Sequence, residues 1–159
     1  MVIVFYGLSQ HSTEYIVEEV IDGDTIKLKS GERVRYIGID TPELKGKDGK
    51  PEFYAWEAKE ANRKLVEGKK VKLEFDVEKR DRYGRLLAYV YVDGLMVNEW
   101  LVANGYARAV VFPPNVKYEE HFRRLEDEAQ ELGLGIWRDI TKNAPACRSV
   151  FGYMLVTAW

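Results

Sequence analysis

Acidic side chains flank two apolar runs near the start of the chain. The stretch IDGDTIKL holds Asp22 and Asp24, and the stretch RYIGIDTPE carries Asp40 and Glu43 at its end. Asp-Gly and Asp-Thr-Pro are also ordinary turn signals, so each acid taken alone has a structural explanation. If the two strands are antiparallel neighbours, however, Asp24 and Asp40 come together, and carboxylates about 4 Å apart repel by about 4 kcal/mol at an effective dielectric of about 20. A positive group between them is therefore expected.

A divalent cation would meet that need. Calcium accepts carboxylates, backbone carbonyls and water in a loose shell of oxygen ligands. We expect Asp24, Asp40 and the carbonyl of Thr41 to bind Ca²⁺, with Asp22 and Glu43 close by or acting through water. The combination of these acids favours a metal site over the turn interpretation, which would suffice for any one of them.

Two arginines accompany the acids. Arg35 lies in the same apolar stretch as Asp40, and the turn RDRYGR places Arg85 at the start of a later apolar run. A guanidinium presents a planar fork of donors that matches phosphate oxygens. An arginine inside an apolar strand is expected either to pair with an acid or to bind a ligand. A cation site beside two such arginines indicates phosphate chemistry. We interpret Arg80 and Arg82 as ordinary surface arginines.

Five segments with the pattern of β-strands must position these side chains. The first three are joined by tight turns into a meander, the fourth alternates apolar and charged residues, and the fifth, LLAYVYV, is continuously apolar and suits a central strand. The expected strands span residues 15–21, 25–29, 33–39, 70–77 and 86–92.

Three helical patterns complete the domain. We expect the first helix to hold Pro51 in its first turn and to end before Gly68, and the second to lie within 96–105. The third ends at Gly133 and has an apolar stripe formed by Tyr118, Phe122, Leu125, Ala129 and Leu132. The segment 44–50 is expected to be a surface loop. This order of elements predicts the α+β class, with a five-stranded OB-type Greek-key β-barrel and three α-helices.

The composition bounds the class of protein. A chain of 159 residues, 46% of them hydrophobic, can form one core, and its 24 basic and 26 acidic residues nearly cancel, which excludes a globally basic DNA-binding protein. Any nucleic-acid contact must therefore be local. Cys147 is the single cysteine, so no intrachain disulfide can form, and His11 and His121 lack the spacing of a zinc site.

Both ends of the chain are apolar. MVIVFYGL lacks the basic region of a signal peptide, and SVFGYMLVTAW is far shorter than the roughly 20 residues of a membrane helix. We expect no membrane span, and both a cytoplasmic and a secreted location stay open. The expected parts are an apolar N-terminal extension (1–13), the OB domain (14–138) and a C-terminal tail (139–159). We expect a monomer, with self-association through the apolar ends as the alternative.

Five strings together resemble the thermonuclease (staphylococcal nuclease) family. They are VIDGDTIKL, RYIGIDTPE, DRYGRLLAYVY, DGLMVNEWLV and LGIW, in that order and with closely similar spacing, and they cover about residues 14–138. The resemblance implies an OB barrel with three helices and calcium-dependent hydrolysis of DNA and RNA phosphodiesters, leaving 3′-phosphate and 5′-hydroxyl ends. By motif, Asp24, Asp40 and the Thr41 carbonyl would bind Ca²⁺, and Asp22 matches an acid close to the metal.

The same resemblance assigns the groups that contact substrate. Arg35 and Arg85 would hold the scissile phosphate, and Glu43 would act on the attacking water, either as its base or by positioning it. Tyr83 matches a tyrosine near the terminal phosphate of the bound nucleotide. Val110 and Phe112 stand where family members often place tyrosines against the base, so base stacking would be weaker or altered in its preference.

Three functional classes follow from these residues. The favoured class is a Ca²⁺-dependent nuclease acting on single-stranded or frayed DNA and RNA. A catalytically inactive nucleic-acid-binding OB module is the first alternative, although such domains usually lose the acids and arginines that this chain keeps. The second alternative is a protein-interaction domain that uses the apolar ends.

Overall fold

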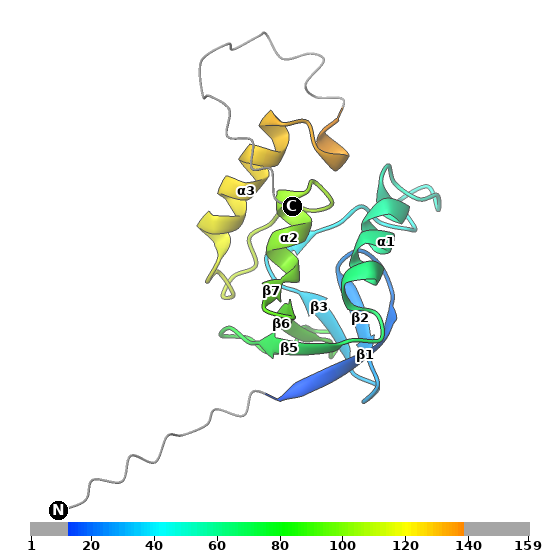
Figure 1. Cartoon of the computed structure of the whole chain (residues 1–159), viewed down its shortest axis with the longest axis vertical. Helices are drawn as coiled ribbons and strands as arrows, with labels where there is room; N and C mark the ends of the chain where they lie inside the picture. The colour runs from blue at the N-terminus through cyan, green and yellow to red at the C-terminus, as the bar shows by residue number, and fades with distance from the viewer. Residues whose placement is uncertain (1–12, 139–159) are drawn as a thin grey trace, which may run out of the picture.

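The computed structural model describes residues 13–138, and five of its strands close into a barrel (Figure 1). The sheet runs in the order β3-β2-β1-β5-β6, and a parallel pairing of β3 with β6 closes it. The barrel strands are β1 (Glu14–Val20), β2 (Thr25–Leu28), β3 (Arg33–Tyr36), β5 (Lys70–Glu74) and β6 (Leu86–Val92). The predicted fold, an α+β OB-type barrel, is confirmed.

Three helices lie together on one side of the barrel, where α2 contacts both α1 and α3 (Figure 1). They are α1 (Ala55–Val66), α2 (Val97–Ala103) and α3 (Glu119–Glu131), followed by the short 3₁₀ turn η1 (Gly135–Trp137). No helix within residues 13–138 combines the length and the apolar character needed to cross a membrane. The predictions about the apolar ends concern residues 1–12 and 139–159, which lie outside the described residues.

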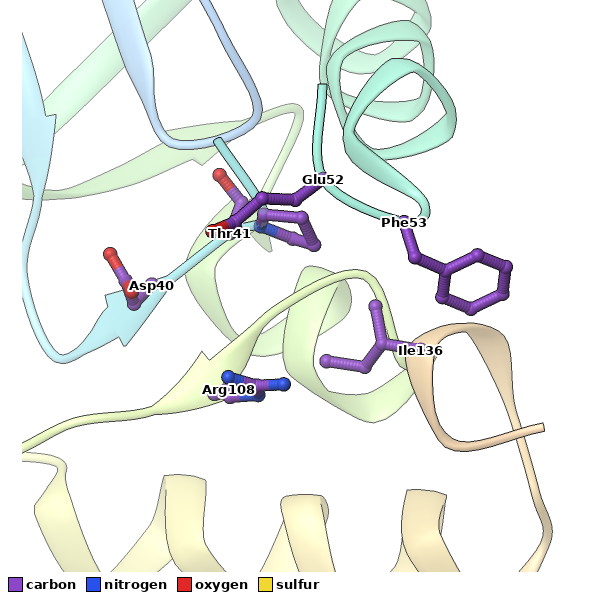
Figure 2. Close-up of a pocket in the computed structure, with 7 residues that line it drawn as sticks. Asp40, Thr41, Glu52, Phe53, Arg108 and Ile136 are labelled. Carbon is purple, nitrogen blue, oxygen red and sulfur yellow. The ribbon is translucent and has the colours of Figure 1, made fainter. Parts of the chain in front are cut away.

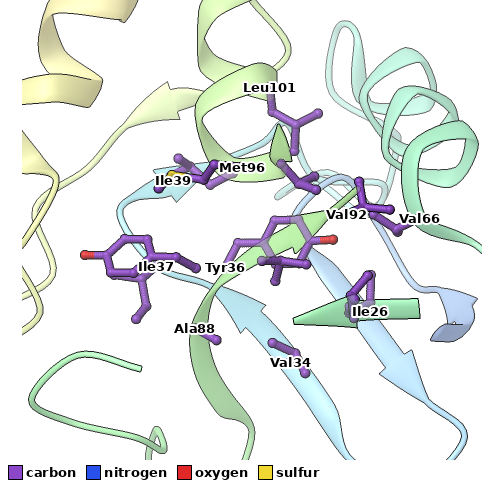
Figure 3. Close-up of a cluster of buried hydrophobic side chains, with 14 of the residues drawn as sticks. Ile26, Val34, Tyr36, Ile37, Ile39, Val66, Ala88, Val92, Met96 and Leu101 are labelled. Atoms are coloured by element: carbon purple, nitrogen blue, oxygen red, sulfur yellow. The ribbon is translucent and has the colours of Figure 1, made fainter. Parts of the chain in front are cut away.

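The core fills the barrel and the space beneath the helices (Figure 3). Alternate residues of β2 and β3 point inward, so Ile26, Leu28, Val34 and Tyr36 are fully buried. The buried hydroxyl of Tyr36 donates to Asn62 Oδ1 at 2.9 Å, which satisfies both polar groups. This core holds the meander in a fixed register and so fixes the side chains at its ends.

Four expectations about element ends are wrong. The third strand ends at Tyr36 and not at residue 39, because a turn at residues 37–38 separates it from a short strand at Ile39–Asp40. Pro51 does not lie in the first turn of α1, because Tyr54 adopts a left-handed conformation (φ 71°) and the helix begins only at Ala55. Val77 is 70% exposed because the pairing of β5 with β6 stops at Glu74. Leu132 is 72% exposed because it follows the last residue of α3 and so leaves the apolar stripe.

Three two-residue strands were not expected. They are β4 (Ile39–Asp40), β7 (Leu95–Met96) and β8 (Arg108–Ala109). β7 extends the sheet beside β6, and β4 pairs with β8 in a separate antiparallel ladder. The register of that ladder places Arg108 opposite Asp40. Segments this short carry no periodic pattern, so only the folded chain reveals them.

Candidate active site

A buried arginine joins the two predicted metal-binding carboxylates. Arg35 Nη2 lies 3.1 Å from Asp24 Oδ2 and 2.8 Å from Asp40 Oδ1. Its Nη1 donates to the carbonyl oxygens of Tyr36 and Ile39, each at 2.8 Å. Because Arg35 is only 8% exposed, these contacts hold its guanidinium in one orientation. The positive group between the carboxylates is thus, within the protein itself, Arg35.

Asp24 is held by the segment that carries the other site residues. Its Oδ2 accepts hydrogen bonds from the backbone N–H of Thr41 at 3.0 Å and from Thr41 Oγ1 at 3.1 Å, and its Oδ1 accepts one from Thr25 Oγ1 at 3.0 Å. The turn before Asp24 packs closely on the same segment, since a Cβ on Gly23 would lie 2.6 Å from Thr41 Oγ1. Only glycine permits this approach, which explains the DGD sequence physically.

The acids around Arg35 carry more negative charge than one guanidinium compensates. Burial and the adjacent charge of Asp24 raise the pKa of Asp22 to about 7. Burial also raises the pKa of Asp40, despite the nearby Arg35. The pKa of Glu43 is raised by burial and then by the charges of Asp24 and Asp40. This part of the molecule therefore attracts a further cation.

The predicted Ca²⁺ ligands fit that cation in their chemistry. No group of three or more His, Cys, Asp or Glu side chains among residues 13–138 is arranged to hold a metal ion. The predicted set does not need such a group, because it combines two carboxylates, Asp24 and Asp40, with the backbone carbonyl of Thr41. All three are the hard oxygen ligands that Ca²⁺ prefers.

Arg85 and Tyr83 lie on the neighbouring turn. Arg85 Nε donates to Asp81 Oδ2 at 2.7 Å, and its guanidinium lies 5.7 Å from the centre of the Tyr83 ring, which is 69% exposed. The parallel pairing of β3 with β6 sets Arg35 opposite Leu87, two residues beyond Arg85. Arg35 thus lies on β3 and Arg85 directly before the adjacent strand β6, but Arg85 is bound to Asp81 and not to the acids around Arg35.

Glu43 and Phe112 lie near the cluster on two different loops. The side chain of Glu43 is exposed, while its backbone N–H donates to Glu52 Oε2 at 3.0 Å and its carbonyl accepts from the Glu52 N–H at 2.9 Å. The Phe112 ring is 41% exposed, and its centre lies 5.9 Å from the Arg35 guanidinium. An aromatic face beside Arg35 could contact a base while the guanidinium holds a phosphate.

A pocket opens beside Asp40 and includes two charged residues that the sequence analysis missed (Figure 2). Glu52 comes from the loop before α1, and Arg108 comes from β8. Neither residue lies in a motif, and the β4–β8 ladder that brings Arg108 to Asp40 has only two residues in each strand. No signal in the sequence could have found them.

Comparisons with known proteins agree with this architecture. The family described as "Staphylococcal nuclease homologue" matches residues 33–139. Endonuclease YncB of Bacillus subtilis (strain 168) is 48% identical over 126 residues, which cover 76% of this chain and 60% of YncB. The SPbeta prophage-derived endonuclease YokF of the same organism is 46% identical over 126 residues, covering 76% of this chain and 43% of YokF.

A third relative matches over most of its own length. The thermonuclease of Staphylococcus hyicus is 42% identical over 135 residues, which cover 82% of this chain and 80% of that protein. The chain thus spans about half the length of the two Bacillus relatives and most of the staphylococcal one. With a family match across most of the barrel, identity above two fifths and a closed five-stranded barrel with three helices, the chain belongs to the thermonuclease family of staphylococcal nuclease homologues.

Proposed function

We propose that this protein is a Ca²⁺-dependent nuclease that hydrolyses phosphodiester bonds of DNA and RNA and leaves 3′-phosphate and 5′-hydroxyl ends. The observation that carries the proposal is the contact of Arg35, 8% exposed, with both Asp24 and Asp40 beside an open pocket. Burying Arg35 and Asp24 beside a further carboxylate is a costly way to stabilise a fold, and ionisable groups in such environments concentrate at functional sites. The names of the relatives, which include endonucleases and thermonucleases, support the same activity.

Arg35 and Arg85 would bind the scissile phosphate. Arg35 is held rigidly by two backbone carbonyls, so it can meet growing negative charge on the phosphoryl oxygens without reorganising. Arg85 is 31% exposed at its side chain, and its salt bridge with Asp81 is near solvent, so a phosphate can replace Asp81 at little cost. Tyr83, next to Arg85, would contact the terminal phosphate, and Phe112 would contact the base.

Glu43 would act on the attacking water. Its raised pKa makes the carboxylate a stronger base than an ordinary glutamate, which favours proton abstraction from the water. Its backbone bonds to Glu52 hold the loop while the side chain reaches solvent. The alternative role, positioning the water by a hydrogen bond, needs the same placement but no proton transfer.

Asp24, Asp40 and the Thr41 carbonyl would hold the Ca²⁺ ion. When bound, the cation would polarise a phosphoryl oxygen and lower the charge that the two arginines must neutralise. Asp22 would add negative charge nearby. Because the uncatalysed reaction is among the slowest in biology, these groups together must lower the barrier by on the order of 20 kcal/mol.

The test is hydrolysis of single-stranded DNA and RNA in Ca²⁺ and in EGTA. Wild-type protein should cleave both in Ca²⁺ and neither in EGTA, and the products should accept a 5′-phosphate from a kinase without prior phosphatase treatment. Glu43→Gln should lower kcat by roughly a hundredfold or more, whereas Glu18→Gln, an exposed acid on β1, should not. Cleavage that continues in EGTA would refute the metal requirement. Binding without cleavage by the wild-type protein would favour an inactive nucleic-acid-binding module.

A further inference from the structure

We propose that the pocket beside Asp40 binds the nucleotide next to the scissile phosphate, with Arg108 contacting the phosphate of that nucleotide. This inference rests on the proposed function and extends it to a second substrate-binding site. The pocket has a volume of about 210 Å³ and is lined by Asp40, Thr41, Pro42, Glu52, Phe53, Arg108 and Ile136. It is smaller than the roughly 300 Å³ at which drug-sized ligand sites begin, so it suits one unit of a polymer.

The pocket is continuous with the proposed catalytic groups. Asp40 and Thr41 belong both to the pocket and to the Arg35 cluster. Figure 2 shows Arg108 on the β8 side of the pocket, facing the β4 segment that carries Asp40 and Thr41. If the scissile phosphate of a bound nucleic acid lies at Arg35, the neighbouring nucleotide would therefore lie in this pocket.

Arg108 is an exposed cation whose charge acts on Asp40 and Glu126. Among residues 13–138 it forms no salt bridge, whereas Arg35 and Arg85 are each bound to aspartates. Its guanidinium lies 5.6 Å from the centre of the Trp137 ring, and this contact limits where the side chain can point. The donors of a guanidinium stacked on a ring stay directed around its edge, where a phosphate can accept two hydrogen bonds.

The opposite end of the pocket is apolar. Phe53 is 62% exposed and lies near Ile136 at the end away from Asp40 (Figure 2). An exposed aromatic ring at one end of a pocket and a cation at the other can bind single-stranded nucleic acid, because the base stacks on the ring while the cation holds the backbone. Phe53 would take the base of the unit whose phosphate contacts Arg108.

The two acids of the pocket would oppose phosphate binding unless a cation offsets their charge. Asp40 and Glu52 would repel an approaching phosphate, and Asp40 already shares Arg35 with Asp24. Arg108 lies opposite Asp40 and supplies the positive charge on that side of the pocket. Removing it should therefore weaken substrate binding more than it slows the chemical step.

The test uses short single-stranded oligonucleotides that contain one uncharged methylphosphonate linkage on the 5′ or the 3′ side of a fixed central phosphate. Their Kd is measured by fluorescence anisotropy, at several salt concentrations and in EGTA, so binding is read without cleavage. Arg108→Gln is compared with the wild type and with Arg124→Gln, a matched exposed arginine on α3 that also forms no salt bridge among residues 13–138. Circular dichroism and thermal unfolding confirm that each variant is folded.

Arg108→Gln should raise Kd about fivefold or more for the fully charged oligonucleotide and reduce the slope of log K against log salt by about 0.7. One of the two methylphosphonate linkages should raise the Kd of the wild type by the same factor. It should leave the Kd of Arg108→Gln unchanged, because the linkage and the substitution remove the same contact. Arg108→Lys should restore part of the affinity.

The inference is overturned if both methylphosphonates weaken binding by the wild type and by Arg108→Gln equally, or if Arg124→Gln raises Kd as much as Arg108→Gln does. A wild-type protein that fails to cleave in Ca²⁺ would overturn the proposed function, and the binding results would still decide the role of Arg108.

Discussion

Replacing Asp22 by asparagine should stabilise the protein at alkaline pH and leave its stability nearly unchanged in acid. The pKa of Asp22 in the folded protein is about 7, raised from an ordinary value of 3.8 by burial and by the charge of Asp24. Between these two pH values the folded chain binds more protons than the unfolded chain, so stability falls as pH rises from about 4 to about 7. Asparagine keeps the Oδ1 atom that accepts the Asp24 N–H at 3.2 Å but carries no charge.

The magnitude follows from the separation of the two pKa values. At about 1.4 kcal/mol for each pH unit between them, ionisation of Asp22 costs the wild type about 4 kcal/mol of its free energy of unfolding at about pH 8. Asp22→Asn should recover most of that energy at about pH 8 and almost none at about pH 4, where the wild-type carboxyl is protonated in the folded state. Partial exposure of the side chain reduces the measured gain below the full value.

The assay is urea unfolding followed by circular dichroism, in EGTA, across this pH range. Asp127→Asn, an exposed aspartate on α3, is the matched control and should change stability by less than about 0.5 kcal/mol at every pH. If Asp22→Asn alters stability by the same amount at both extremes of pH, Asp22 is not a destabilised buried carboxylate. The inference that the acids around Arg35 attract a further cation would then lose its electrostatic basis.

Other changes test the geometry of the site. Gly23→Ala should destabilise the protein by about 2 kcal/mol or more in thermal unfolding, because its Cβ would lie 2.6 Å from Thr41 Oγ1; an unchanged Tm would contradict the close packing. Arg35→Lys should lower both stability and kcat, since an ammonium cannot reproduce the guanidinium bonds to two carbonyls and two carboxylates; full activity on single-stranded DNA would exclude a bidentate role. Ca²⁺ should raise the Tm of the wild type but much less that of Asp40→Asn, and equal shifts would place the cation elsewhere.

The sequence predicts the barrel well because its strands carry local signals. The alternation in β5, the continuous apolar run of β6 and the Asp-Gly turns are each readable within a few residues. The ends of elements were less predictable, as Pro51 and Val77 show. Helix starts and strand ends depend on which backbone groups find partners in the folded chain, and those partners are distant in sequence.

The candidate site was predictable only in part. The motifs predicted that Asp24, Asp40 and Arg35 lie together. In the structure both carboxylates contact the same guanidinium nitrogen of Arg35. Their proposed roles toward metal and substrate stay predictions. That Arg85 is bound to Asp81 is decided by the turn geometry around Gly84, which the motif alone does not describe.

By itself, the sequence determined the class of fold, the family and the residues able to do phosphate chemistry. Periodicity, turn chemistry and motif spacing each depend on the order of residues along the chain and need no knowledge of tertiary contacts. Only the tertiary structure decided that Arg35 contacts both carboxylates and that Arg108 pairs in register with Asp40 beside a pocket. The physical reason is that charges interact through space, and the distance between Asp40 and Arg108 depends on a ladder of two residues in each strand that the whole packed core must hold in register.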